Sequence, residues 1–225
     1  MPARLVLFEG ISGSGKSALS EHAATHLGMQ GLMTQWLSES ALLGDTFAPF
    51  WTAFSQRHDQ LSTILLEDWQ RLAQTMHQTN AIFILDGALS VVTIALLLAV
   101  DMPHTHICQT AHEVLACVSA FNPCIIHLRG DVDAIVQRTQ EARGVAWLQH
   151  LTPFVNGQTY QLARGRTGRA GVGLFLLDMQ MLLGDVLQQP YALCSIDSTA
   201  GDWTDYQQTI MTYLKHQFQV SGNGA

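Results

Sequence analysis

Short apolar runs recur along the chain, and segments of helix length separate them. The runs occupy residues 4–8, 32–37, 81–85, 124–128 and 191–196. Runs of this length are typical of buried strands, and their alternation with helical segments favours a parallel sheet that helices cover on both faces. The pattern therefore predicts an α/β fold, a doubly wound parallel sheet of five strands.

A longer apolar run covers residues 88–100 and is closed by Asp101 and Pro103. A helix that spans a bilayer needs about 20 apolar residues, so this run is too short to cross a membrane. We expect a buried helix here and no membrane partner.

The composition is that of a compact globular protein. Hydrophobic residues make up 48% of the 225 residues, and charged residues make up 13%. A chain of this length can bury its core as one unit, so we expect a single domain over residues 1–225.

The charge balance and the cysteines bear on partners and compartment. Eleven basic residues against 18 acidic residues give a net charge of −7, which is the wrong sign for nonspecific binding along nucleic acid. No signal-peptide pattern precedes the first apolar run, and the four cysteines form no C-x-x-C pair, which is typical of reduced thiols. We expect a cytoplasmic protein and do not expect a nucleic-acid partner.

One short motif carries most of the chemical information. Residues 10–17 read Gly-Ile-Ser-Gly-Ser-Gly-Lys-Ser and match the phosphate-binding pattern G-x-x-x-x-G-K-[ST] at every fixed position. A strand-like run precedes the motif and a helix-forming segment, residues 18–27, follows it, which is the context that the pattern requires. We therefore expect a nucleotide-binding loop made of Gly10, Ser12, Gly13, Ser14, Gly15, Lys16, Ser17 and Ala18.

The residue types in this phosphate loop suit a nucleoside triphosphate with magnesium. Successive backbone N–H groups and the helix N-terminus donate to the phosphates, and glycines let the backbone approach them closely. Lys16 adds a positive charge that can follow the phosphoryl group, and the Ser17 hydroxyl is the expected protein ligand of Mg²⁺. ATP and Mg²⁺ are the expected cofactors, although the sequence does not distinguish ATP from GTP.

Carboxylates end two of the other predicted strands. Asp86 follows the third apolar run, and Glu39 follows the second. Ligands of open α/β sheets bind beyond the C-terminal ends of the strands, so both carboxylates are candidates for the site. Asp86 is expected to hold Mg²⁺ together with Ser17 or to accept the proton of an acceptor hydroxyl, and Glu39 is expected to act on the acceptor. Each can instead cap the helix that follows it, and the sequence does not decide which is the general base.

Residues 8–17 resemble the opening of thymidylate kinases and their nucleoside and nucleotide kinase relatives. Residues 127–138, followed by 141–144, are similar to the fourth strand, the helix and the arginine-bearing lid of those kinases. The resemblance implies a phosphate-loop kinase fold with a helical lid over about residues 138–173, in which Arg138 and Arg143 close over the phosphates. It also implies that residues 197–202 lie beside the adenine.

The chain departs from thymidylate kinases at two positions. Ser12 stands where those kinases typically carry an aspartate, and Gly87 follows Asp86 where they typically carry an Asp-Arg pair. Both departures remove groups that handle a nucleoside monophosphate, so thymidylate kinase activity is not expected. Residues 143–147, 156–160 and 173–187 resemble segments of a group of uncharacterised phosphate-loop proteins. This resemblance implies a kinase without naming its acceptor.

Two further groups of residues leave alternatives open. Arg164, Arg166 and Arg169 lie among glycines, where they suit either a clamp for an anionic acceptor or a solvated connector. An aromatic group between the second and third apolar runs suits either an acceptor pocket or a core, and its helical spacing favours the core. This group consists of Phe47, Phe50, Trp51, Phe54 and Trp69.

The sequence thus predicts an ATP- and Mg²⁺-dependent phosphotransferase. Its acceptor is expected to be a small molecule, such as a nucleoside-like or nucleotide-like metabolite or an antibiotic. The expected catalytic residues are Lys16, Glu39, Asp86, Arg138 and Arg143. The alternatives are a nucleotide-dependent switch or accessory ATPase, and a kinase of nucleic-acid ends or modified bases. The sequence does not decide between a monomer and a homodimer.

Overall fold

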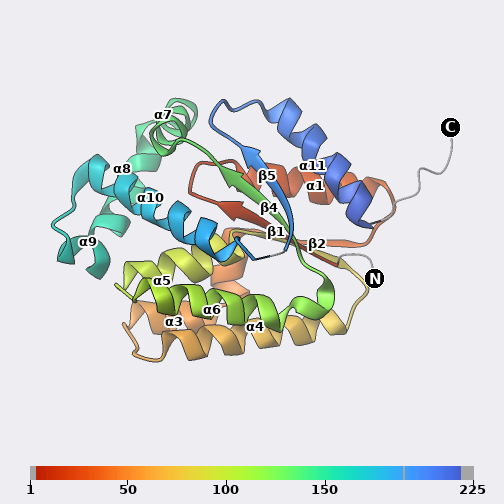
Figure 1. Cartoon of the computed structure of the whole chain (residues 1–225), viewed down its shortest axis with the longest axis horizontal. Coiled ribbons are helices and arrows are strands. Elements are labelled where there is room, and N and C mark those ends of the chain that lie inside the picture. Colours follow the sequence, from red (N-terminus) through yellow and green to blue (C-terminus); the bar gives the residue numbers. More distant parts are fainter. Residues whose placement is uncertain (1–3, 190, 219–225) are drawn as a thin grey trace.

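A five-stranded sheet forms the centre of the computed structural model, which describes residues 4–189 and 191–218 (Figure 1). In spatial order the strands are β2 (Thr34–Leu37), β3 (Ile82–Asp86), β1 (Leu5–Gly10), β4 (Cys124–Arg129) and β5 (Ala192–Asp197). Every neighbouring pair of strands is parallel. The predicted doubly wound α/β fold is confirmed, and each strand end lies within two residues of the predicted run.

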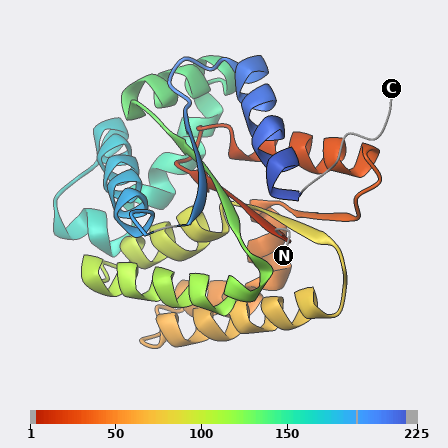
Figure 2. The same cartoon turned by 45° about the vertical axis from the view of Figure 1, so that its right-hand side comes forward.

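Helices cover both faces of the sheet (Figure 2). One face carries α1 (Lys16–Met29) and α11 (Trp203–Phe218). The other face carries α4 (Leu61–His77), η2 (Ala88–Ala95), α5 (Leu96–Ala99), α6 (His104–Cys117) and α10 (Gly168–Val186). The remaining segments are α2 (Glu39–Ala41), η1 (Leu42–Thr46), α3 (Ala48–Ser55), η3 (Ser119–Phe121), α7 (Val132–Arg143), α8 (Val145–Asn156) and α9 (Thr159–Ala163).

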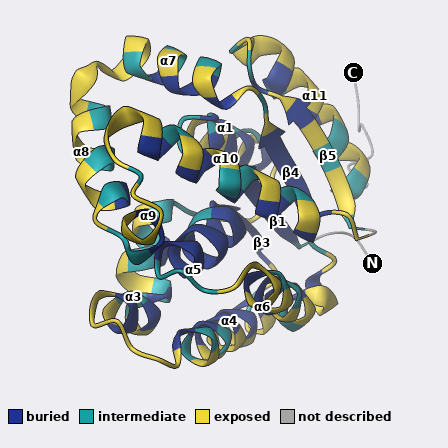
Figure 3. Cartoon of the chain, turned by 60° about the vertical axis from the view of Figure 1, so that its left-hand side comes forward, coloured by how far each residue is buried: buried dark blue, intermediate teal, exposed yellow. Residues whose placement is uncertain are grey.

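Alternate residues of the central strands build two separate cores. Leu5 and Leu7 of β1 join the core under α4, α6 and α10, whereas Val6 and Phe8 join the core under α1 and α11. Strands that are buried on both faces need apolar residues at consecutive positions, which explains the continuous apolar runs of the sequence. β5 lies at one edge of the sheet and is largely exposed (Figure 3).

The apolar run of residues 88–100 folds as predicted into a buried helical segment. It begins as the π-helix η2 and continues directly into α5, and nearly all of its side chains are buried. Across the described residues, every helix is too short or too polar to cross a membrane.

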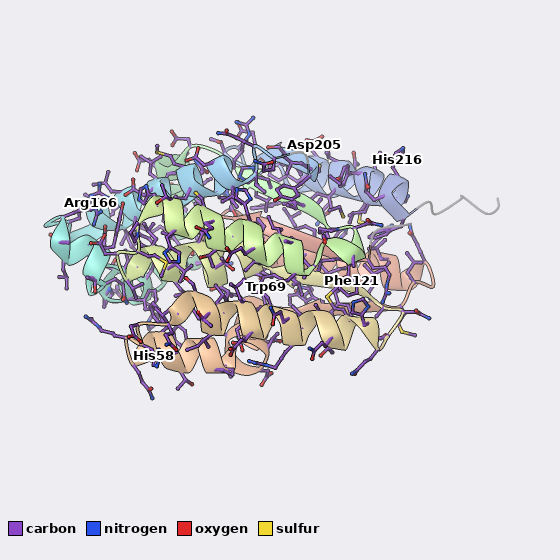
Figure 4. All side chains as sticks on the ribbon, turned by 60° about the horizontal axis from the view of Figure 1, so that its bottom comes forward. His58, Trp69, Phe121, Arg166, Asp205 and His216 are labelled. Carbon is purple, nitrogen blue, oxygen red and sulfur yellow. The ribbon has the colours of Figure 1, made fainter. Side chains whose placement is uncertain are left out.

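The aromatic group between β2 and β3 belongs to the core, as its spacing favoured. Phe47, Phe50, Phe54 and Trp69 are buried in the core between α3, α4 and the sheet, and Trp51 packs against the edge of that core. Trp69 lies in the middle of the helical layer in Figure 4. These rings therefore stabilise the fold.

The region predicted as a lid contains the end of α7, all of α8 and α9, and the start of α10. α8 packs against both α7 and α10, and Val155 of α8 and Tyr160 of α9 are buried. The region is therefore helical and packed on the rest of the chain. Its movement over a substrate, like the assignment of residues 1–225 to one domain, stays a prediction.

Candidate active site

The phosphate loop connects β1 to α1 through backbone conformations that only glycine adopts readily. Gly13 has φ +91° and Gly15 has φ +100°, both in the left-handed region. A Cβ atom at Gly13 would overlap with the Thr139 hydroxyl, and one at Gly15 would overlap with the indole of Trp203. The glycines of the motif are therefore required both by the turn and by the close packing of α7 and α11 against it.

The beginning of α1 leaves polar groups free to meet a ligand. Ser17 and Ala18 are exposed, and Gly15, which precedes the helix, provides no side-chain cap for its first N–H groups. Uncapped N–H groups at a helix N-terminus carry a partial positive charge and suit an anion. The buried Lys16 side chain points back into the loop, where its Nζ donates to the Ile11 carbonyl at 3.1 Å.

Asp86 lies at the end of β3, directly beside the strand that leads into the phosphate loop. It pairs with Phe8 in the sheet register, its side chain is 1% exposed, and neither carboxylate oxygen has a hydrogen-bond partner. A buried carboxylate is costly unless a cation or donors compensate it. The Asp86 carboxylate therefore fits a divalent cation such as Mg²⁺.

Glu39 begins the short helix α2, which Ser38 caps by accepting a hydrogen bond from the Ala41 N–H at 3.3 Å. Burial raises the pKa of the Glu39 carboxyl above its ordinary value, and the negative charge of Asp86 raises it further. The positive charges of Lys16 and Arg143 act in the opposite direction. Lys16, Asp86 and Arg143 are thus near enough to Glu39 for their charges to act on its carboxyl.

The resemblance implies that Arg138 closes over the phosphates, but in this structure its guanidinium is bound by backbone carbonyls. Its guanidinium donates to the carbonyls of Ser198, Thr199 (2.8 Å) and Gly13 (3.2 Å) and lies 5.1 Å from the centre of the Trp203 ring. It therefore ties the phosphate loop to the loop after β5. A contact of Arg138 with phosphates stays a prediction, as does the neighbouring adenine. Arg143, at the end of α7, is exposed.

Two residues of the site were not singled out from the sequence. Glu9 is fully buried, and its carboxylate accepts from the N–H groups of Leu89 (3.0 Å) and Ser90 (2.6 Å), while the Ser90 hydroxyl accepts from the Gly10 N–H (3.3 Å). Burial is the main cause that raises the Glu9 pKa to about 7. Glu9 thus joins the end of β1 to the start of η2, which follows Asp86. The sequence could have pointed to Glu9, because it is an acidic residue directly after an apolar strand run.

Trp203 is the second such residue. Its indole packs on Gly15 and on Arg138, yet the residue is still 39% exposed. The outer part of this ring therefore faces solvent beside the phosphate loop. Nothing local in the sequence marks this position, because the contact joins the first and last helices of the chain.

Two of the three arginines of the arginine-rich loop are paired with carboxylates. Arg164 donates to Asp101 at 2.7 Å and lies 3.6 Å from the centre of the Tyr160 ring, and Arg166 forms an ion pair of 2.5 Å with Asp178. Arg166 lies at one end of the molecule in Figure 4. This arrangement favours the connector interpretation of the two that the sequence left open.

Comparison with known proteins identifies the fold. No protein-family model matches the chain, and no curated protein matches its sequence. Among solved structures, deoxyadenosine kinase from M. mycoides with bound dCTP has a TM-score of 0.53 at 13% identity, covering 94% of this chain and 99% of that one. The chain has the fold of this nucleoside kinase.

Two other solved structures are similar over nearly their whole length. APE1195 has a TM-score of 0.51 at 14% identity and covers 96% of both chains. A candidate kinase from Chloroflexus aurantiacus has a TM-score of 0.50 at 16% identity, covering 97% of this chain and 96% of that one. Identities this low establish a common fold and leave activity to be argued from the site.

Proposed function

We propose that the protein is an ATP- and Mg²⁺-dependent kinase that transfers the γ-phosphoryl group to a hydroxyl of a small molecule. The observation that carries the proposal is Asp86, which ends the strand beside the one that leads into the phosphate loop and whose buried carboxylate has no hydrogen-bond partner. The fold similarity to a deoxyadenosine kinase supports the same class of reaction.

On the donor side, the loop N–H groups and Lys16 bind the phosphates of ATP. Ser17 and Asp86 are the residues that would hold Mg²⁺, which when bound neutralises charge on the phosphates. The buried, unpartnered carboxylate of Asp86 supports this assignment. Glu9 and Ser90 keep Asp86 and the loop in register, because they join the strand before the loop to the helix after Asp86.

On the acceptor side, we assign to Glu39 the role of the general base that takes the proton of the acceptor hydroxyl. The acceptor oxygen forms a bond to the γ-phosphorus, the bond from that phosphorus to the bridging oxygen breaks, and ADP leaves with the bond's electron pair. The hydroxyl proton passes to the Glu39 carboxylate, whose raised pKa improves it as a base. Arg143 compensates the charge that develops on the transferred group.

We propose that the reaction takes place in the cytoplasm, where ATP is abundant and where Cys108, Cys117, Cys124 and Cys194 stay as the free thiols that the structure contains. A nucleic-acid acceptor is not supported, because Arg164 and Arg166 are engaged by Asp101 and Asp178.

The test is transfer of labelled γ-phosphate from MgATP into a mixture of nucleosides, sugars, amino alcohols and aminoglycosides. Lys16→Ala is the blank, and Lys215→Ala, which removes an exposed lysine of α11, is the matched control. We expect a labelled product with the wild type and Lys215→Ala that falls by about 100-fold or more in Lys16→Ala. Equal labelling by Lys16→Ala and the wild type would contradict the proposal.

A further inference from the structure

The outer face of α10 is apolar and exposed. Leu174, Leu177 and Met181 are 41%, 40% and 61% exposed, and their spacing of i, i+3 and i+7 places them on one side of the helix. Figure 3 shows α10 at the surface, with exposed positions along its length. Single exposed hydrophobic side chains are ordinary, whereas a contiguous group of them is typical of an interaction surface.

Two glycines on the same face are not explained by packing within the chain. Glycine inside a helix is less stable than alanine, yet a Cβ at Gly184 would meet no atom of the described residues within 4 Å, and one at Gly173 would make only an ordinary contact of 3.7 Å with Asp133. By contrast, a Cβ at Gly171 would come within 2.7 Å of Asn156. Gly173 and Gly184 suit the close approach of another backbone to this face.

Beside these glycines the surface is hollowed into a cavity of about 740 Å³. Four of its lining residues follow one another along α10 at i, i+3, i+4 and i+7, namely Ala170, Gly173, Leu174 and Leu177. Four residues at this spacing form the hole that receives one side chain of a neighbouring helix in knobs-into-holes packing. The cavity therefore fits a side chain that a second helix presents.

α10 itself presents such a side chain. In an antiparallel pair of α10 helices with a two-fold axis at Leu177, each residue lies level with the one equally far from Leu177 in the opposite direction. Met181, the most exposed of the three apolar residues, is then level with Gly173 of the second copy and enters the hole. Gly184 is level with Ala170 of the second copy, so neither pair of residues keeps the helices apart.

The charges of α10 favour the same arrangement. Between residues 170 and 184 the chain contains one charged residue, Asp178, which forms an ion pair with Arg166. Arg169 lies in the first turn of α10 and Asp185 in the last turn, and both are exposed. Antiparallel packing places the basic first turn of each helix level with the acidic last turn of the other, and it also opposes the two helix dipoles.

We propose that the protein forms a homodimer in which the outer faces of α10 from two copies pack antiparallel around a two-fold axis at Leu177. Both copies use the same surface, as two-fold symmetry requires. The contact extends to Val132 and Asp133 in the first turn of α7, which line the same cavity. This inference goes beyond the proposed kinase function and does not depend on it.

Sedimentation equilibrium at increasing protein concentration compares the wild type, Met181→Glu and Met29→Glu. The last is the matched control, because it places the same charge at a methionine of α1 that is 81% exposed. We expect the wild type and the control to reach twice the monomer mass of 24.7 kDa. Met181→Glu should dimerise at least about 100-fold more weakly, because its carboxylate would be buried in the hole without a partner.

Two results of this experiment would overturn the proposal. One is a wild type that stays monomeric at every concentration, which would leave the face to a different protein. The other is a dimer that Met181→Glu does not weaken, which would place the interface elsewhere.

Leu177→Cys tests the position of the two-fold axis. Residues on the axis lie opposite each other, and closely packed helices bring two thiols there within reach of a disulfide. With oxidised glutathione as the oxidant, we expect a disulfide-linked dimer from Leu177→Cys in non-reducing electrophoresis. The controls are Met29→Cys and the wild type, which carries four free cysteines. No more linked dimer from Leu177→Cys than from these controls would overturn the proposed packing.

Gly184→Gln weakens the dimer without introducing a charge. The space around Gly184 is open within the described chain, and glutamine is a better helix former than glycine. We therefore expect thermal unfolding of the monomer at an unchanged or higher temperature, together with a dimer affinity that falls by about tenfold or more. A dimer affinity equal to that of the wild type would overturn the close approach of the helices at this position.

Discussion

The phosphate loop and the connector of residues 164–171 both combine glycines with basic side chains, but their polar groups have different surroundings. In the connector, Arg164 and Arg166 meet Asp101 and Asp178. At the phosphate loop, the first N–H groups of α1 have no side-chain cap and both oxygens of Asp86 are without partners. The two regions therefore share a composition, and what distinguishes the candidate site is a buried carboxylate, that of Asp86, without a hydrogen-bond partner.

The two regions should also contribute differently to the free energy of unfolding. Carboxylates that are paired within the fold stabilise it, whereas a buried carboxylate without partners opposes folding until a ligand compensates it. Asp178 and Asp86 represent these two cases. The comparison can be tested by variants that treat the two regions alike.

Glu39→Gln should give the largest effect on activity. It removes the proposed base while keeping the shape of the side chain, so we expect kcat to fall by about 100- to 10,000-fold with little change in nucleotide affinity. Steady-state kinetics with the acceptor found in the transfer assay provide the measurement. Glu67→Gln, at an exposed position on α4, is the matched control. An unchanged kcat in Glu39→Gln would remove Glu39 from the chemistry.

Glu9→Gln should change how stability depends on pH. Burial raises the pKa of Glu9 from 4.5 to about 7, so its contribution is fully present below pH 4.5 and is lost as pH rises through about 7. We expect the wild type to lose about 3 kcal/mol of unfolding free energy relative to Glu9→Gln over this interval. Chemical denaturation of both proteins across the interval measures it. A difference that stays constant with pH would show that Glu9 is not the titrating group.

Asp178→Asn and Asp86→Asn apply the same change to the two regions and should act in opposite directions on stability. Asp178→Asn leaves the partly exposed Arg166 without its ion pair, and we expect a loss of about 1 kcal/mol with unchanged activity. Asp86→Asn removes an unpartnered buried charge, so the ligand-free protein should be equally or more stable. Thermal unfolding without nucleotide compares them, and destabilisation by Asp86→Asn larger than that by Asp178→Asn would reverse the comparison.

Much of the fold could be predicted because its signals are local. The central strands are apolar at consecutive positions, and the phosphate loop is a contiguous motif between a strand and a helix. The positions of Glu39 and Asp86 followed from the rule that ligands bind at the C-terminal ends of strands.

The features that could not be predicted depend on contacts between distant segments. Trp203 meets Gly15 only because α11 packs beside α1. The partner of Arg164 is Asp101, in the turn after α5, and the partner of Arg166 is Asp178 of α10. No periodicity or spacing encodes such pairs. Glu9 lies within a motif that was recognised, but its role depends on η2, which joins it through Leu89 and Ser90.

Calorimetric titration of ADP, with and without Mg²⁺, into the wild type and Asp86→Asn tests the central claim most directly. If the unpartnered carboxylate holds the metal, Mg²⁺ tightens ADP binding to the wild type by about tenfold or more. Asp86→Asn then binds metal-free ADP as the wild type does and loses the magnesium effect. Equal tightening by Mg²⁺ in both proteins, or no ADP binding by the wild type, would contradict the account.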